Sequence, residues 1–118
     1  MVENLTTDTF KEKIFDFENA KEWMFKGNKP AIIDFAAEWC GPCKMVGPII
    51  NELSDEIGDK IDFFKVDVDE EHQLASMLGI KSIPTIIFIP LKGEPKASVG
   101  AMTKSQMLKA IKDNLGVE

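Results

Sequence analysis

The chain has 118 residues, of which 44% are hydrophobic and 29% are charged, and this length and composition suit one compact domain with its own core. Its formal charge of −6 argues against nucleic acid as the main partner, because nucleic-acid binding requires a basic face. No window is long and apolar enough to predict a membrane span, so we expect no membrane partner.

The first residues lack the basic start and apolar stretch of a secretory signal, and the chain opens on Met1. This predicts a cytoplasmic protein. A periplasmic or otherwise exported chain whose leader had been replaced by a new Met would look the same, so that alternative stays open.

A helix over about 8–16 is predicted by Thr9 and Glu12, which fit a capping box, and by apolar residues at helical spacing after them. The next segment is unusually rich in large apolar side chains: Phe15, Phe17, Trp23, Met24 and Phe25. We expect it to pack on a sheet, with a partner-binding surface as the alternative. Residues 27–30 are a turn signal.

Residues 31–37 form a nearly continuous apolar run, which predicts a strand buried on both faces, with Asp34 as its anomaly. Apolar residues at helical spacing between Cys43 and Ile57 predict a helix that is capped at Cys40, ends at Gly58 and is kinked at Pro48. Residues 61–68 then predict a second strand. Strand, helix and strand within 40 residues indicate a βαβ unit with parallel strands.

A further helix is predicted from a cap at Asp69 to Gly79, followed by a strand over 83–89. The loop 90–94 carries hairpin chemistry, so residues 95–99 should pair antiparallel with that strand. Thr103 and Gln106 make a capping box for a last helix that reaches residue 115. The elements predict an α/β fold: one domain over 1–118, with a central mixed β-sheet flanked by helices.

The two cysteines of the chain, Cys40 and Cys43, lie between the first predicted strand and the helix that follows it. This spacing is typical of a redox dithiol. A free thiol with a pKa near 8.5 is only about 3% ionised at neutral pH, and a helix N-terminus lowers that pKa. We expect Cys40, at the cap, to be the exposed attacking thiolate and Cys43, in the first turn, to be the more buried resolving thiol.

Three alternatives to a redox role for the cysteine pair are weaker. A structural disulfide closing so small a loop gains little from chain entropy. A zinc site needs four ligands, and the chain offers two cysteines and His72, which we expect on an exposed turn. Two core cysteines at this spacing by chance conflict with Gly41 and Pro42, because such turn residues bring the segment to the surface.

The sequence Trp39-Cys40-Gly41-Pro42-Cys43-Lys44 resembles the active-site signature of the thioredoxin family. The similarity runs from about Lys29 to the C-terminus. Other segments that fall where thioredoxins have their counterparts are Asp34-Phe35, Pro48, Lys65 with Asp67 and Asp69, Ile83-Pro84-Thr85, and Val99-Gly100-Ala101. The resemblance implies a thioredoxin fold, a redox disulfide between Cys40 and Cys43, and no bound cofactor or metal.

The resemblance also implies a role for Asp34 as proton acceptor and donor for Cys43 during resolution. A lone carboxylate in a buried strand is costly to ionise, so its pKa should be raised. Lys65, also in mid-strand, would tune Asp34. A structural ion pair between Asp34 and Lys65 is the alternative.

By the same resemblance, Pro84 is a cis-proline facing the dithiol, and Ile83 offers backbone hydrogen bonds to an extended substrate segment. A trans proline at a strand edge is the alternative for Pro84, and a merely packed aromatic is the alternative for Trp39. The apolar docking surface would consist of Trp39, Gly41, Pro42, Ile83, Gly100 and Ala101.

The pair Gly41-Pro42 resembles that of reducing members of the family. The expected reaction is reduction of protein disulfides by a monomer, with electrons from NADPH through a flavoprotein thioredoxin reductase. Two alternatives are a non-catalytic interaction subunit that uses the same surface and a dedicated thiol-disulfide oxidoreductase of an exported compartment.

Three features depart from the family pattern. Ala36 stands where an aromatic residue is usual, so we expect weaker packing beside the site and an effect on its dynamics or potential. Ser82 stands where glycine is common, which should reshape the docking groove. Residues 1–28 form an atypical, aromatic-rich N-terminal segment, for which a specialised partner surface is one possible role.

Overall fold

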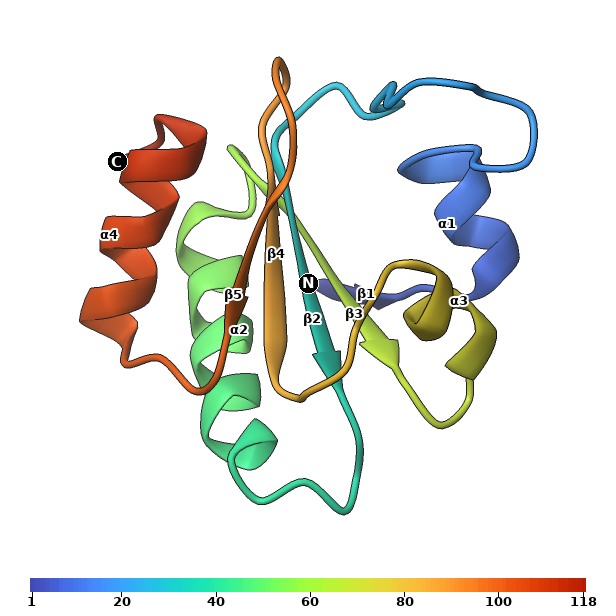
Figure 1. Ribbon diagram of the computed structural model, residues 1–118. Coiled ribbons are helices and arrows are strands. Elements are labelled where there is room, and N and C mark those ends of the chain that lie inside the picture. Colours follow the sequence, from blue (N-terminus) through green and yellow to red (C-terminus); the bar gives the residue numbers. More distant parts are fainter.

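A computed structural model describes residues 1–118. Its five-stranded mixed sheet has the strand order β1-β3-β2-β4-β5 and is covered by helices on both faces (Figure 1). In chain order the elements are β1 (Val2–Asn4), α1 (Thr7–Lys13), β2 (Ala31–Ala36), α2 (Cys43–Ile57), β3 (Asp62–Asp67), α3 (His72–Met77), β4 (Thr85–Ile89), β5 (Lys96–Val99) and α4 (Lys104–Leu115). The predicted fold class is confirmed.

Strand β2 lies at the centre of the sheet, parallel to β3 on one side and antiparallel to β4 on the other. Every residue of β2 is buried, as its continuous apolar run predicts. The predicted parallel pairing of β2 with β3 and the predicted hairpin of β4 with β5 are both confirmed. Because β2 is central, the short loop that follows its C-terminal end places Cys40 next to the middle of the sheet.

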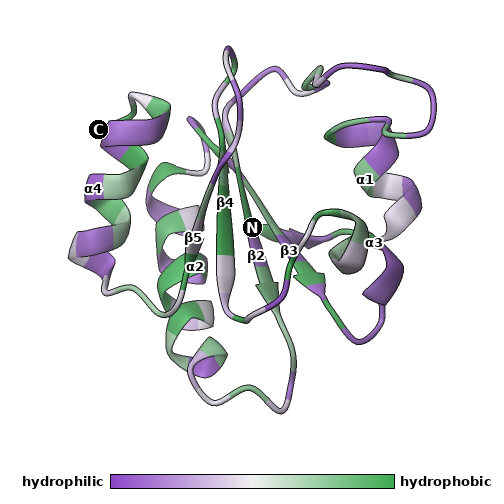
Figure 2. Ribbon diagram, viewed as in Figure 1, coloured by the Kyte–Doolittle hydropathy of each residue, from purple (hydrophilic) through white to green (hydrophobic).

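Two apolar cores lie on opposite faces of the sheet. Helices α2 and α4 cover one core, which includes Ile32, Val46, Leu53, Phe88 and Ile111. Helices α1 and α3 lie on the other side of the sheet, over a core that includes Phe10, Ile14, Phe35, Val66 and Leu74. Figure 2 shows hydrophobic colour concentrated on the central strands and polar colour on the outer helix surfaces. None of the helices is long and apolar enough to cross a membrane.

The aromatic N-terminal segment packs on the α1–α3 core, as expected. Phe15 and Trp23 have ring centroids 4.9 Å apart, and Phe10 and Phe17 have centroids 6.1 Å apart. Phe25 is also packed against this core, whereas Met24 is 69% exposed. Most of the large apolar side chains of this segment therefore serve the fold.

Strand β1 was not predicted, because three residues are too few to show a period. It adds a parallel edge to β3, and the Leu5 N–H continues this contact by donating to the Lys65 carbonyl at 2.8 Å. The predicted capping box of the first helix is wrong by one turn. Thr6 is the cap, and its hydroxyl accepts from the Thr9 N–H while the Thr9 hydroxyl accepts from the Thr6 N–H.

The predicted helix start at Asp69 is also wrong. The Asp67 carboxylate accepts the N–H groups of Asp69 and Glu70, which holds these residues in a turn before α3. The helix therefore starts at His72, with Glu71 at its cap and no side-chain capping bond. Asp69 is thereby left free for another contact.

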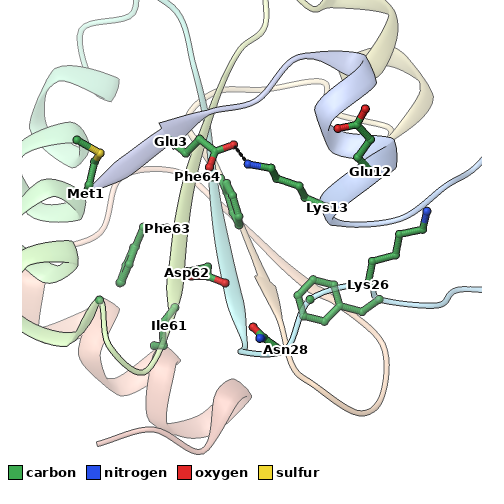
Figure 3. Close-up of a pocket in the computed structure, with 13 residues that line it drawn as sticks. Met1, Glu3, Glu12, Lys13, Lys26, Asn28, Ile61, Asp62, Phe63 and Phe64 are labelled. Carbon is green, nitrogen blue, oxygen red and sulfur yellow. Dashed lines mark hydrogen bonds and ion pairs between the residues drawn. The ribbon is translucent and has the colours of Figure 1, made fainter.

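A hollow of about 470 Å³ lies at the β1–β3 edge, beside the start of β3 (Figure 3). Its lining includes Glu3 and Lys13, which form an ion pair, and the aromatic rings of Phe25 and Phe63. Because the dithiol lies beyond the C-terminal end of β2, which is parallel to β3, this hollow is at the opposite end of the sheet.

Candidate redox site

Cys40 and Cys43 are joined by a disulfide, with their Cα atoms 5.3 Å apart. Cys40 lies in the loop between β2 and α2, and Cys43 is the first residue of α2. The Cys43 N–H donates a hydrogen bond to the Cys40 Sγ at 3.2 Å. One of the free N–H groups of the helix start therefore points at the sulfur of the first cysteine.

Two details of the predicted dithiol geometry differ from the structure. Pro42, not Cys40, is the N-cap of α2. Cys40 and Cys43 are almost equally buried, at 4% and 5% exposed, so the expected exposure of Cys40 is wrong for the disulfide form. Both cysteines pack in a small cluster with Ala36 and Ala37, and Ile83 packs against it. This packing, together with the bond between the sulfurs, accounts for their burial.

Asp34 is 1% exposed in the middle of β2, and its Oδ1 has no hydrogen-bond partner. Burial raises the pKa of this carboxyl from 3.8 to about 6, whereas the positive charge of Lys65 acts to lower it. Lys65 stands opposite Asp34 in the β2–β3 register, but no ion pair joins them and Lys65 is exposed. The structural ion pair considered as an alternative is therefore absent.

The loop before β4 approaches the same cluster. The Ile83–Pro84 peptide bond is cis, Pro84 is buried, and Ile83 packs against the cysteine cluster. The Pro84 carbonyl accepts the N–H of Gly100 at 2.8 Å. Gly100 has φ +103°, a backbone conformation that favours glycine, and Ala101 beside it is exposed. The structure thus links Ile83, Pro84 and Gly100 beside the dithiol.

Trp39 is 69% exposed, and its indole N–H donates to the Asp69 carboxylate at 2.7 Å. Gly41 and Pro42 are also exposed on this loop. Sequence reasoning missed this role of Asp69 because it treated Asp69 as a helix cap, and no spacing pattern relates two residues that lie 30 positions apart. The bond fixes the ring of Trp39 beside the disulfide.

Ser82 and Ala36, which depart from the family pattern, have different surroundings. Ser82 is exposed, and its carbonyl accepts the Thr85 hydroxyl at 2.5 Å. Ala36 packs in the cysteine cluster and also lines a hollow beside Cys43. No group of three or more His, Cys, Asp or Glu side chains is arranged to hold a metal ion.

The sequence matches the thioredoxin family over residues 1–113. It is 50% identical over 116 residues to a thioredoxin of Borreliella burgdorferi, covering 98% of this chain and 99% of that one. It is 37% identical over 108 residues to a thioredoxin of Rickettsia prowazekii, covering 92% and 93%.

A solved structure of a thioredoxin from Malassezia sympodialis superposes with a TM-score of 0.77 at 38% identity, covering 97% of this chain and 90% of that one. The crystal structure of chloroplastic thioredoxin z superposes with a TM-score of 0.79 at 25% identity, covering 95% and 92%. Sequence, fold and cysteine pair agree, and the chain belongs to the thioredoxin family of thiol-disulfide reductases.

Proposed function

We propose that Cys40 is the nucleophile that attacks substrate disulfides and that Cys43 resolves the resulting mixed disulfide. The hydrogen bond from the Cys43 N–H to the Cys40 Sγ carries this assignment, because it stabilises negative charge on Cys40 and on no other sulfur. In the reaction the Cys40 thiolate displaces one substrate sulfur, and Cys43 then displaces the other as it closes the Cys40–Cys43 disulfide.

Asp34 takes the proton from Cys43 during resolution and returns it when the disulfide is reduced. A carboxyl with a pKa of about 6 can exchange a proton with a thiol near neutral pH, which an ordinary aspartate does poorly. Lys65 tunes Asp34, since its charge limits the rise of the Asp34 pKa that burial causes. Asp34 and Lys65 are cross-strand neighbours in β2 and β3, and the chain continues from β2 to the cysteine pair.

The substrate docks as an extended segment on the loop before β4. Ile83 supplies backbone hydrogen bonds, and cis-Pro84 shapes the loop on which they are presented. Trp39, held by Asp69, forms one wall of the surface. The remaining contacts come from exposed or half-exposed small residues near the dithiol: Gly41, Pro42, Gly100 and Ala101.

Family membership implies disulfide-containing proteins and a reductase as partners. Because thioredoxins bind no cofactor themselves, we assign the electron supply to NADPH through a flavoprotein thioredoxin reductase. We further propose that the chain acts in the cytoplasm as a monomer and as one domain over residues 1–118. Support for one domain comes from residues 1–28, whose strand β1 joins the sheet and whose aromatic residues pack on its core.

Reduction of insulin disulfides in the presence of NADPH and thioredoxin reductase tests this function. The wild-type protein should turn over, and Cys40→Ser should lose at least about 1,000-fold in rate, because no other group supplies the attacking thiolate. Asp59→Asn, at an exposed position, serves as a control that keeps the rate. An inactive wild type, or an active Cys40→Ser variant, would contradict the assignment.

The roles of Cys43 and Asp34 are tested by separating the two steps. Cys43→Ser should accumulate substrates as mixed disulfides on Cys40, detectable by mass spectrometry after capture. Asp34→Asn should slow resolution by about 100-fold or more while changing mixed-disulfide formation much less, as expected when a general acid–base group is lost. Equal slowing of both steps would show that Asp34 acts only through the structure or the potential of the site.

A further inference from the structure

A hollow of about 780 Å³ lies between α2 and the β1–β3 side of the sheet, next to the dithiol. Its size is in the range of small-molecule sites. Of the two cysteines, only Cys43 lines it. The docking residues around Ile83 and Pro84 do not contribute to it, so it is distinct from the substrate surface described above.

Two small residues keep this hollow open. Ala36, at the end of β2, lines the hollow from the sheet, and Gly47 lines it from α2. A Cβ atom placed on Gly47 would meet no other atom within 4 Å. Larger side chains at these two positions would therefore fill the hollow.

The polar groups around the hollow suit a small zwitterionic ligand. Lys44 and Lys65 line it, and all ion pairs of the chain use other lysines. Asn51 adds an amide, and Glu38 and Asp67 add carboxylates. Free lysine ammonium groups can donate hydrogen bonds to the carboxylates of a ligand, and the acidic side chains can accept hydrogen bonds from its ammonium group.

We propose that this hollow binds a small thiol compound that carries carboxylate and ammonium groups, and that it presents the ligand's sulfur to Cys43. A thiolate attacks a disulfide sulfur from the side opposite the partner sulfur. Since Cys43 lines the hollow and Cys40 does not, we infer that a thiol bound there attacks the Cys43 sulfur and that Cys40 becomes the leaving group. Because the Cys43 N–H already donates to the Cys40 Sγ, the departing thiolate is stabilised as it forms.

The reaction balances in two exchanges. The small thiolate bonds to the Cys43 sulfur and the Cys40–Cys43 bond breaks, leaving a thiolate on Cys40. A second small thiolate then attacks the ligand sulfur of the mixed disulfide, which yields the small disulfide and frees Cys43 as a thiolate that takes up a proton. Two small thiols are oxidised and the protein disulfide is reduced, so this chain has a second route for electrons through Cys43.

This inference depends on the proposed function only in taking Cys40 as the better leaving group. Its test therefore measures reactions of single cysteines and not the turnover of a substrate. Glutathione disulfide is the probe, and its reaction with a single cysteine is the reverse of the second exchange. The rate of glutathione addition to Cys43 is measured in Cys40→Ser, and the rate of addition to Cys40 in Cys43→Ser, by mass spectrometry.

Ala36→Trp is then added to both single-cysteine proteins. It should slow the reaction of Cys43 about ten-fold, corresponding to about 1.4 kcal/mol of lost binding, and leave that of Cys40 within about two-fold. Gly47→Leu should do the same from the helix side, and it keeps the test available if Ala36→Trp does not fold. Ala97→Leu, on the exposed edge of β5, is the size control and should change neither rate.

The charge of the ligand is tested with Lys44→Gln in the Cys40→Ser protein. Glutathione disulfide carries carboxylates, whereas cystamine carries only ammonium groups. The ratio of their rates with Cys43 should fall about five-fold, the change expected for one exposed charge contact near 4 Å. Equal slowing of Cys40 and Cys43 by the filling variants, no slowing of Cys43, or an unchanged ratio would overturn the proposal. Loss of insulin reduction with these results intact would instead overturn the function.

Discussion

The Asp34 carboxyl makes the stability of the protein depend on pH. Its pKa is about 6 in the folded protein, raised by burial, against 3.8 for an ordinary aspartate. Between these values the folded chain holds a proton that the unfolded chain has released, so stability falls as pH rises through this range. Above about pH 6 Asp34 is ionised in the folded protein, and the free energy of unfolding is lower than at acidic pH by about 3 kcal/mol, at about 1.36 kcal/mol per pKa unit.

We therefore expect Asp34→Asn to stabilise the oxidised protein at pH 7.5 by up to about 3 kcal/mol, and to have almost no such effect at pH 4. Urea unfolding at the two pH values measures this difference. Asp59→Asn, which removes an exposed carboxylate, should show no comparable gain at pH 7.5. A stabilisation by Asp34→Asn that is the same at both pH values would mean that ionisation of Asp34 is not its cause.

Single residues were predictable from the sequence where the chemistry is local. A carboxyl within an apolar run is expected to be buried and to have a raised pKa, and the raised pKa of Asp34 confirms that expectation. The expected cis bond before Pro84, suggested by family resemblance, is also present. The contact between Trp39 and Asp69 joins side chains far apart in the sequence, and only the fold brings them together. The burial of Cys40 likewise depends on how Ala36 and Ala37 pack around it.

Elements were predictable in proportion to their length. The 15-residue helix α2 shows several turns of apolar periodicity, and its predicted end at Gly58 is confirmed, whereas its cap is Pro42 and not the predicted Cys40. The short elements were less certain. Strand β1 has three residues, and the starts of α1 and α3 depend on which of several neighbouring polar side chains accepts the free N–H groups.

Gly47, inside helix α2, lowers the stability of that helix. Glycine costs up to about 1 kcal/mol relative to alanine inside a helix, and a Cβ at this position meets no neighbour. Gly47→Ala should therefore raise the free energy of unfolding by about 0.5–1 kcal/mol. Gly58→Ala is the contrasting variant, because its Cβ would collide with the Ser54 carbonyl oxygen, and it should destabilise. Urea unfolding of both proteins distinguishes them, and a destabilised Gly47→Ala protein would show that the glycine is needed there for another reason.

For the molecule as a whole, the sequence predicted a mixed sheet between helices but not its strand order. The antiparallel pairing of β2 with β4 joins strands about 50 residues apart, and it places the cis-Pro84 loop at the sheet edge where β2 leads to Cys40. Such pairing is decided by how the two apolar cores close on either face, which no local pattern encodes. The site is thus a product of topology as well as of its motif.

The same two cores should keep the protein folded when its disulfide is reduced. The disulfide closes a loop of very few residues, and chain entropy then gives it only about 2 kcal/mol of stabilisation. Each core contains ten buried apolar residues from several elements, and none of these residues depends on the disulfide for its packing partners. Reduction should therefore lower the free energy of unfolding by about 2 kcal/mol and leave the far-ultraviolet circular dichroism spectrum unchanged.

Urea unfolding with and without dithiothreitol measures this difference. The protein that lacks both cysteines (Cys40→Ser, Cys43→Ser) is the control, and dithiothreitol should not change its stability. A reduced protein that unfolds without urea would mean that the disulfide, and not the paired cores, holds this fold together.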